Sequence, residues 1–327
     1  MSQSKTVLSV KDLAVQFKSK EETVHVVNGV SFEVAREEVL GIVGESGCGK
    51  SVSMLSVLDL LPKPHGQVVE GSSALFKGRD LLGLGGREMA KIRGNDIGIV
   101  FQDPIVSFNP VYTIGNQLTE ALRTHGKASQ KEAAERACEM LALVGIANPG
   151  QRMKDFPHQF SGGMRQRAMI AMALICNPDL LIADEPTTAL DVTVEAQIVS
   201  LVKELQQRFK MGIIWITHDL GLLAGLADRI AVMYGGYMVE VSPVEALYEN
   251  PLHPYTIGLL GSLPRLDQAS YRRLESIDGL PPILREKPSY CPFVSRCKRA
   301  AARCHSKNPT LQAYESGHLA ACWNAGR

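Results

Sequence analysis

The sequence predicts an α/β fold in which a mostly parallel sheet is combined with helices. Short apolar runs at residues 39–43, 180–184 and 212–218 are typical of buried strands, and segments of helical spacing lie between them. Strands that alternate with helices favour a parallel sheet. A glycine-rich loop directly follows the first run. Because the chain has no internal repeat, we expect a single α/β unit with such a loop.

Length and composition exclude several classes of protein. The chain has 327 residues, 45% of them hydrophobic and 21% charged, with a net charge of +1. So small a charge gives no support for nucleic acid as a partner. The N-terminus is polar, and the apolar run at residues 168–176 is far shorter than the roughly 20 residues of a membrane span. We expect a soluble cytosolic chain with reduced thiols.

The remaining elements follow in chain order. Residues 7–17 alternate partly and predict an edge strand, and residues 24–34 predict two strands joined by a turn at Asn28 and Gly29. Residues from about 110 to 160 carry Ala, Glu, Arg and Leu at helical spacing and predict a helical insertion. After about residue 245 the composition shifts to Pro, Tyr and Arg, and a cysteine-rich end follows.

The segment GESGCGKS, residues 44–51, matches the phosphate-binding pattern G-x-x-x-x-G-K-[ST] and follows a predicted strand. Its glycines let successive backbone N–H groups face phosphate oxygens, and the helix that starts near Lys50 adds its positive end. Lys50 is expected to reach the β- and γ-phosphates of a nucleotide, and Ser51 to hold Mg²⁺. The alternative is a glycine-rich turn that matches by chance.

A second predicted strand, LLIAD, ends in the carboxylates Asp184 and Glu185. At the end of a sheet strand, Asp184 is suited to bind Mg²⁺ directly or through water, and Glu185 to activate the attacking water as a general base. Two acids at a strand end are also typical of a solvated turn. The presence of the phosphate loop favours the catalytic interpretation.

Further motifs in a fixed order give the chain a family resemblance. FSGGMRQR at residues 160–167 precedes the carboxylate strand, ALD at residues 189–191 follows it, and Gln102 and His218 stand before and after. Over roughly residues 7–245 the chain resembles the nucleotide-binding subunits of ABC transporters. The resemblance implies a RecA-like core, an N-terminal antiparallel β subdomain and a helical subdomain at about 103–168, all within a domain of residues 1–248.

The resemblance also implies roles for single residues. Gln102 senses the γ-phosphate and Mg²⁺, and His218 orients the attacking water together with Glu185. Ser161 and Gly163 contact ATP held by a partner subunit, so that ATP lies in a dimer interface. Met164 departs from the glutamine common in the family at that position.

The residues expected at the site form four groups. The ATP-binding group is Phe17, Gly44, Glu45, Ser46, Gly47, Cys48, Gly49, Lys50, Ser51, Val52, Gln102 and Asp184. The catalytic group is Lys50, Gln102, Glu185 and His218, and the Mg²⁺ ligands are Ser51, Gln102 and Asp184. The group that serves the partner's ATP is Ser161, Gly162, Gly163 and Asp191. Phe17 is assigned to adenine stacking, with a core role as the alternative.

The stretch that follows Gln102 is expected to form a docking groove. By the resemblance, Pro104, Phe108, Pro110 and Tyr112 line a groove that receives a helix of a transmembrane partner.

The segment NPLHPYTIGLLGSLPRL and the terminal cysteines resemble the D-type ATPase subunit of dipeptide and oligopeptide importers. The resemblance implies peptide uptake, although some relatives carry nickel, oligosaccharides or glutathione. It also implies a heterodimer with a second homologous ATPase, two permease subunits, an extracytoplasmic peptide-binding protein and a peripheral position on the cytoplasmic face of the inner membrane. Soluble ABC ATPases of DNA repair are the alternative, but only about 110 residues without heptads separate loop and signature here.

Cys291, Cys297, Cys304 and Cys322 crowd the end of the chain, in a region expected to be a separate extension of residues 249–327. Their C-x5-C-x6-C-x17-C spacing lacks the C-x2-C pair of common zinc sites. An iron–sulfur cluster, zinc and free thiols all remain open on the residues alone. The resemblance implies a 4Fe–4S cluster, with a structural role in a tail that lacks an obvious core.

The other three cysteines are Cys48, Cys138 and Cys176. They are expected to be small core or loop residues. Cys48, inside the phosphate loop, is expected to be sensitive to alkylation.

Overall fold

The computed structural model describes residues 6–188, 190–263, 277–315 and 317–326. The chain forms two compact units. In described residues, the first comprises 6–7, 34–38 and 84–215, and the second comprises 8–33, 39–83 and 216–326. The predicted strands at residues 39–43, 180–184 and 212–218 are present as β3 (Val39–Val43), β8 (Leu180–Asp184) and β9 (Gly212–Thr217).

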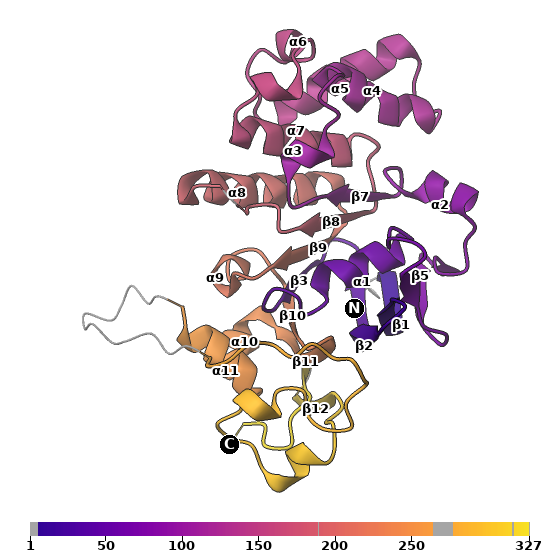
Figure 1. Cartoon of the computed structure of the whole chain (residues 1–327). Coiled ribbons are helices and arrows are strands. Elements are labelled where there is room, and N and C mark those ends of the chain that lie inside the picture. Colours follow the sequence, from indigo (N-terminus) through magenta and orange to yellow (C-terminus); the bar gives the residue numbers. More distant parts are fainter. Residues whose placement is uncertain (1–5, 189, 264–276, 316, 327) are drawn as a thin grey trace, which may run out of the picture. The chain divides into compact units, whose positions relative to one another are not determined.

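In the first unit, β7 (Ile97–Val100) pairs in parallel with β8, and both strands are largely buried. Helices gather beside them, and Figure 1 shows α4, α5, α6 and α7 packed together. The helices are α2 (Gly86–Ile92), α3 (Pro104–Ser107), α4 (Ile114–Thr124), α5 (Gln130–Leu143), α6 (Pro149–Arg152), α7 (Gly162–Leu174) and α8 (Val192–Phe209), with the 3-10 turn η1 (Pro157–Gln159).

The starts of these helices follow from local sequence. Thr113, Ser129, Ser161 and Asp191 are the N-caps of α4, α5, α7 and α8, and each side chain accepts a hydrogen bond from a backbone N–H of the first turn. At α5, Glu132 completes a capping box with Ser129. The predicted helical insertion is therefore confirmed as several short, well-capped helices.

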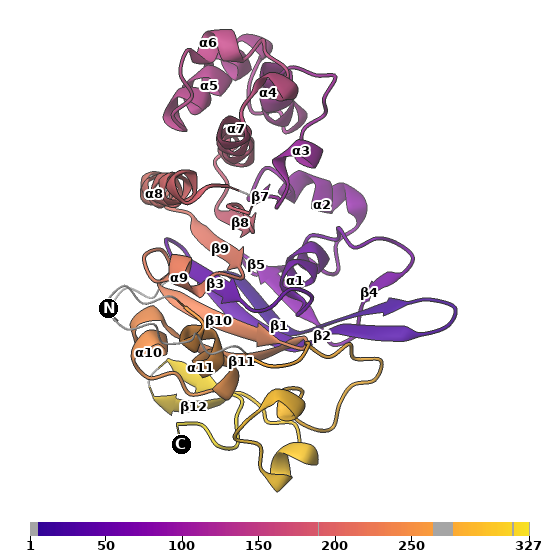
Figure 2. The ribbon, with the colours of Figure 1, turned by 60° about the vertical axis from the view of Figure 1, so that its left-hand side comes forward.

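In the second unit, an antiparallel sheet has the strand order β2–β1–β5–β6, and β4 also pairs with β1. Its strands are β1 (Thr6–Lys18), β2 (Thr23–Ala35), β4 (Gly66–Val68), β5 (Ser73–Phe76) and β6 (Arg79–Asp80), with the ends of β1 and β2 in the first unit. Figure 2 shows the long β1 and β2 side by side.

Two sequence predictions about this sheet are wrong. The strand predicted at residues 7–17 is not at an edge, because β1 has neighbours on both sides. The strand pair predicted at residues 24–34 is one continuous strand, β2. Gly29 takes φ +84° inside it, and the backbone N–H of Asn28 donates to Gly236 O over 2.8 Å, so this dipeptide serves a tertiary contact instead of a turn.

Five strands of a second sheet lie in this unit in the order β12–β13–β11–β10–β3. β10 (Arg229–Tyr234) pairs in parallel with the fully buried β3 and antiparallel with β11 (Tyr237–Pro243). β13 (His318–Ala320) pairs with β11 and β12 (Gln312–Glu315). The helices are α1 (Lys50–Val57), α9 (Leu220–Leu223), α10 (Val244–Glu249) and α11 (Pro254–Gly261).

The C-terminal segment, residues 277–326 apart from 316, packs into this unit through its own side chains. It contains the 3-10 turns η2 (Val294–Arg296) and η3 (Ala302–His305). Phe293 lies 5.0 Å from Tyr234 and 5.4 Å from Tyr255, measured between ring centroids. Buried Glu240 of β11 accepts a hydrogen bond from His318 Nε2 over 2.8 Å. These contacts join the segment to β10, β11 and α11, so the expectation of a tail that lacks an obvious core of its own stays a prediction.

Candidate functional site

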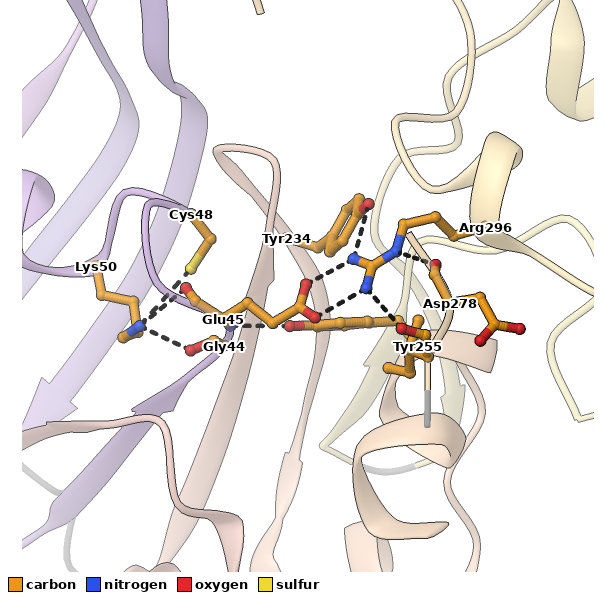
Figure 3. Close-up of polar contacts among 9 residues, drawn as sticks. Gly44, Glu45, Cys48, Lys50, Tyr234, Tyr255, Asp278 and Arg296 are labelled. Atoms are coloured by element: carbon orange, nitrogen blue, oxygen red, sulfur yellow. Dashed lines mark hydrogen bonds and ion pairs between the residues drawn. The ribbon is translucent and has the colours of Figure 1, made fainter. Parts of the chain in front are cut away.

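The phosphate loop, residues 44–51, connects β3 to α1, as predicted. Lys50 is the first residue of the helix, and its side chain turns back into the loop (Figure 3). Nζ donates to Gly44 O over 2.7 Å and to Glu45 O over 3.1 Å, and the residue is only 5% exposed. The ammonium group is thus held inside the ring of backbone that a phosphate would enter.

Glycine is required at two positions of this loop. A Cβ on Gly44 would lie 2.2 Å from Met233 O, and one on Gly49 would lie 2.7 Å from Val26 O. Gly49 also has φ +102°, which L-residues rarely adopt. Close backbone packing therefore requires glycine at these two positions of the pattern.

The carboxylate strand β8 brings two predicted residues together in the first unit. Asp184 is its last residue, and Glu185 follows with φ +46°. Glu185 Oε2 accepts hydrogen bonds from Gln102 Nε2 and Thr188 Oγ1, both over 3.0 Å. The side chain of Gln102 is therefore directed at the candidate general base.

The segment FSGGMRQR, the signature, leads into helix α7. Ser161 is the N-cap of α7, and its Oγ accepts from Met164 N over 3.3 Å. Gly162 opens the helix, and a Cβ on Gly163 would lie 3.2 Å from Val194 of α8. Ser161 and Gly162 are exposed, so a ligand can reach the start of this helix.

Other predicted residues are placed as follows. His218 is exposed directly after β9, and Ser51 and Val52 lie in the first turn of α1. Asp191 is exposed and caps α8 through a bond from Val194 N over 3.0 Å. Ala189 of the ALD motif lies outside the described residues. Phe17 is a half-buried residue of β1, paired with Gly66 of β4.

One predicted surface residue is buried. Phe108 is only 3% exposed, so it cannot line a docking groove as expected. The apolar side chains that do reach the surface of this stretch are Ile105, Val106, Val111 and Tyr112, which are 62%, 79%, 72% and 52% exposed.

Comparison with known families matches two parts of the chain. A model described as ABC transporter covers residues 27–188, and one described as oligopeptide/dipeptide transporter, C-terminal region, covers residues 239–304. The dipeptide transport ATP-binding protein DppD of Bacillus subtilis is 51% identical over 317 residues, which is 97% of this chain and 94% of that protein. The chain belongs to the ABC transporter ATP-binding subunits of this peptide-transport group.

Other relatives agree with this family. The oligopeptide transport ATP-binding protein OppD of Bacillus subtilis is 47% identical and covers 97% of this chain and 88% of its own length. A solved dimer of the ATP-binding cassette MJ0796 with ADP and phosphate matches with a TM-score of 0.64 and 28% identity, over 72% of this chain and 98% of that one. The ABC cassette fold is thereby shown, with its mixed α/β architecture.

In this ABC ATPase, sequence analysis missed the residues that hold Glu45 of the phosphate loop. The two Nη atoms of Arg296 donate to the two carboxylate oxygens of Glu45 over 2.6 and 2.9 Å. The backbone N–H of Glu45 donates to Tyr255 Oη over 2.9 Å. The bond to Glu45 raises the pKa of Arg296, and burial raises the pKa of Tyr255. Both partners lie more than 200 residues away along the chain, so no local pattern indicates them.

Cys48 of the ABC loop is 1% exposed, and its burial raises the pKa of the thiol. Thiolate is the reactive form of cysteine, so a protonated and buried thiol reacts slowly. The expected sensitivity of Cys48 to alkylation is therefore wrong. The expected core position is confirmed for Cys48 and Cys176, which are both buried.

All seven cysteines are free thiols, and the four at the C-terminal end lie near one another. Cys291 N donates to Cys304 O over 2.9 Å. Burial raises the pKa of Cys291 to about 11, and the three other thiols each add to this effect. Burial and neighbouring thiols likewise raise the pKa of Cys322.

The arrangement of these four thiols is not that of a formed metal site. Within the described part of the chain, no group of three or more His, Cys, Asp or Glu side chains is arranged to hold a metal ion. The donor set suits a soft metal centre, and cysteine binds a metal as the thiolate, so ligation would release protons.

Among the described residues, no helix combines the length and the apolar character required to cross a membrane.

Proposed function

We propose that this chain is the ATP-binding and hydrolysing subunit of an importer that energises uptake of dipeptides or oligopeptides. ATP hydrolysis is supported by the phosphate loop with Lys50 inside it and by the 3.0 Å bond that directs Gln102 at Glu185. The observation that carries the cargo class is the 51% identity to a dipeptide transport ATP-binding protein along 94% of its length. The alternative cargoes are nickel, oligosaccharides and glutathione.

In the proposed site, Lys50 neutralises the β- and γ-phosphates of ATP, and backbone N–H groups of the phosphate loop bind their oxygens. Ser51, Gln102 and Asp184 carry the oxygen donors that Mg²⁺ prefers, so their chemistry fits this ion. Mg²⁺ bound there neutralises charge on the transferred phosphoryl group. Phe17 stacks on adenine.

Hydrolysis requires a water molecule aligned with the γ-phosphate. Glu185 accepts a proton from that water as it attacks phosphorus, and the bond between phosphorus and the bridging oxygen breaks, which releases ADP. Gln102 and Thr188 orient the Glu185 carboxylate by their hydrogen bonds. His218, exposed directly after β9, holds the γ-phosphate.

The second half of each ATP site comes from a partner ATPase. Ser161, Gly162, Gly163 and Asp191 of this chain bind ATP that the partner's phosphate loop holds, and closure of the dimer assembles both sites. The exposed start of α7 supports this role, since a helix N-terminus with free access binds phosphate well. The two ATPases form a heterodimer.

The dimer lies on the cytoplasmic face of the cell membrane beneath two permease subunits. The exposed apolar residues Ile105, Val106 and Val111 provide the surface on which a permease helix docks. A peptide-binding protein on the outer side delivers the cargo.

In this proposal, the four cysteines of the predicted C-terminal extension, residues 249–327, hold a 4Fe–4S cluster. Its support is the proximity of four thiols, since four-cysteine ligation suits such a cluster. Zinc is the alternative centre. The cluster has a structural role, because it would tie residues 291 and 322 together.

The cluster is tested on protein purified without air. We expect iron and acid-labile sulfide in the chain, and their loss in Cys304→Ala, whereas Cys138→Ala retains both. Zinc without sulfide, or no metal in either the unmodified chain or Cys138→Ala, contradicts the cluster.

The proposed function is tested in sealed vesicles that contain the assembled importer. With Lys50→Ala in this chain, ATP-driven accumulation of a dipeptide is expected to stop, because the phosphates lose their main cation. Lys63→Ala, which removes an exposed surface ion pair with Asp59, is the control and keeps transport. Uptake at the unmodified rate by the Lys50 variant would refute the proposal.

A further inference from the structure

Glu45 is a junction between the phosphate loop and the C-terminal segment (Figure 3). Its carbonyl oxygen accepts from Lys50 Nζ over 3.1 Å, its backbone N–H donates to Tyr255, and its carboxylate accepts twice from Arg296. A shift of Glu45 therefore displaces the carbonyl that orients Lys50, the cation that ATP requires.

Arg296 is itself fixed at several points. Nε donates to Asp278 O over 2.8 Å, Nη2 to Ile277 O over 3.2 Å and Nη1 to Tyr234 Oη over 3.3 Å. Its side chain is 4% exposed, whereas that of Glu45 is 28% exposed. A bidentate arginine pair shielded from water in this way constrains geometry far better than a surface ion pair.

The charge of Glu45 gives the contact a second consequence. A carboxylate in a phosphate-binding loop repels a triphosphate unless a cation compensates it. Arg296 supplies that compensation from outside the loop, so Lys50 need not be diverted to Glu45.

We propose that Arg296 is a positioning residue for ATP binding, which holds Glu45 and thereby the phosphate loop in the conformation that accepts the triphosphate. The inference rests on the proposed function and adds to it a role for the C-terminal segment. Arg296 does not touch the reacting atoms, so its effect falls on nucleotide affinity and not on the chemical step.

The test compares ATP binding by the full-length chain and three variants in the presence of Mg²⁺. Arg296→Gln is expected to raise the Kd for ATP about tenfold, because a charged hydrogen-bonded pair is lost and Glu45 is left uncompensated. Glu45→Gln is expected to have a smaller effect, and the double variant is expected to bind no worse than Arg296→Gln alone. Arg296→Lys keeps the charge without the two-pronged geometry and is expected to lie between.

A matched control is available in the same segment. Arg285 pairs with Glu22 over 2.8 Å, but their side chains are 75% and 45% exposed, so Arg285→Gln is expected to leave ATP affinity unchanged. Thermal unfolding of every variant identifies any that misfold, and Arg296→Lys then carries the test.

The assembled importer supplies an independent measurement. Arg296→Gln is expected to raise the KM for ATP with kcat at saturating ATP within about twofold of the unmodified enzyme, which separates positioning from general damage. Unchanged affinity, additive effects of the two substitutions, or a loss in kcat alone would overturn the inference. Absence of ATP binding by the unmodified chain would overturn the proposed function itself.

Discussion

Glu185 combines an unusual backbone conformation with a tightly held side chain. A non-glycine residue at φ +46° costs on the order of 1 kcal/mol, and such strain persists where surrounding contacts enforce it. The bonds from Gln102 and Thr188 are contacts of that kind. The strand end thus holds one carboxylate in a fixed position. This favours the role of general base over the interpretation as part of a solvated turn.

We predict that Glu185→Gln retains ATP binding and lowers ATP turnover at least about a hundredfold, because the amide cannot accept the proton of water. ATPase activity of the assembled importer and ATP binding by the chain measure the two effects. The control is Glu132→Gln, which changes an exposed carboxylate in the capping box of α5 and should leave turnover intact. Full turnover in Glu185→Gln would remove this residue from the base role.

His253 links stability to pH. It is 1% exposed, and burial lowers its pKa to about 3. Its Nδ1 accepts from Tyr255 N over 3.1 Å, and its backbone N–H donates to Glu240. Below the ordinary histidine pKa of about 6.5, the unfolded chain takes up a proton that the native state refuses, so this contribution to stability falls as pH falls.

We therefore predict that His253 reduces the free energy of unfolding by about 2 kcal/mol between pH 7 and pH 5. His253→Asn keeps an N-cap acceptor for α11 without a titrating ring, and this part of the pH dependence should disappear. Urea unfolding at both pH values measures it, with the exposed His305→Asn as control. The same pH slope in His253→Asn and the unmodified chain would contradict the prediction.

At the scale of elements, a strand or a helix start could be predicted from the sequence where a local signal alone decides it. The buried strands β3 and β8 follow from apolar runs, the helix start at Lys50 from the phosphate-loop pattern, and the start of α7 from its cap Ser161. The Asn-Gly signal at residues 28 and 29 failed because a tertiary hydrogen bond from Asn28 to Gly236 overrides turn preference. Pairing partners, such as the three strands β2, β4 and β5 that pair with β1, are not encoded locally either.

The residues of the candidate site likewise fall into those with a sequence signal and those without one. Lys50 and Glu185 were predicted because one loop and one strand end fix their positions, and Gln102 was predicted from the family resemblance. Arg296 was not, since it reaches Glu45 across 251 positions of sequence and has no motif of its own. Cys48 was misjudged because its burial comes from packing around the loop.

Two serine caps allow the role of α7 to be separated from its stability. Ser161→Ala and Ser129→Ala each remove an N-cap and should cost about 1 kcal/mol of stability. We predict that only Ser161→Ala lowers ATPase activity of the assembled importer, by roughly tenfold, because in the proposed function Ser161 also binds the partner's ATP. Equal activities of the two variants would confine Ser161 to capping.

At the scale of the whole molecule, the C-terminal segment is bound to its unit by several kinds of contact. β13 pairs with β11, buried Glu240 accepts from His318, and Phe293 packs on Tyr234 and Tyr255. Aromatic packing and buried hydrogen bonds of this kind do not depend on a metal centre. The segment is thus an integral part of the described structure.

We predict that the isolated chain binds ATP but hydrolyses it slowly, and that its homologous partner ATPase raises the rate per chain several-fold or more. The reason is that, in the proposed function, the second half of each site belongs to the other subunit. ATPase rates measured over a dilution series, alone and with the partner, give the result, and a mixture with Lys50→Ala serves as control. A rate per chain that is high alone and independent of dilution would contradict the shared site.

The ion pair between Arg296 and Glu45 also implies an effect of ATP on the C-terminal segment. Binding linkage is reciprocal, so if the docked segment tightens the hold on ATP by some factor, ATP tightens docking by the same factor. The four cysteine thiols of the C-terminal segment would then be exposed to solvent more often when ATP is scarce. The energy status of the cell would thereby govern how fast oxidants reach them.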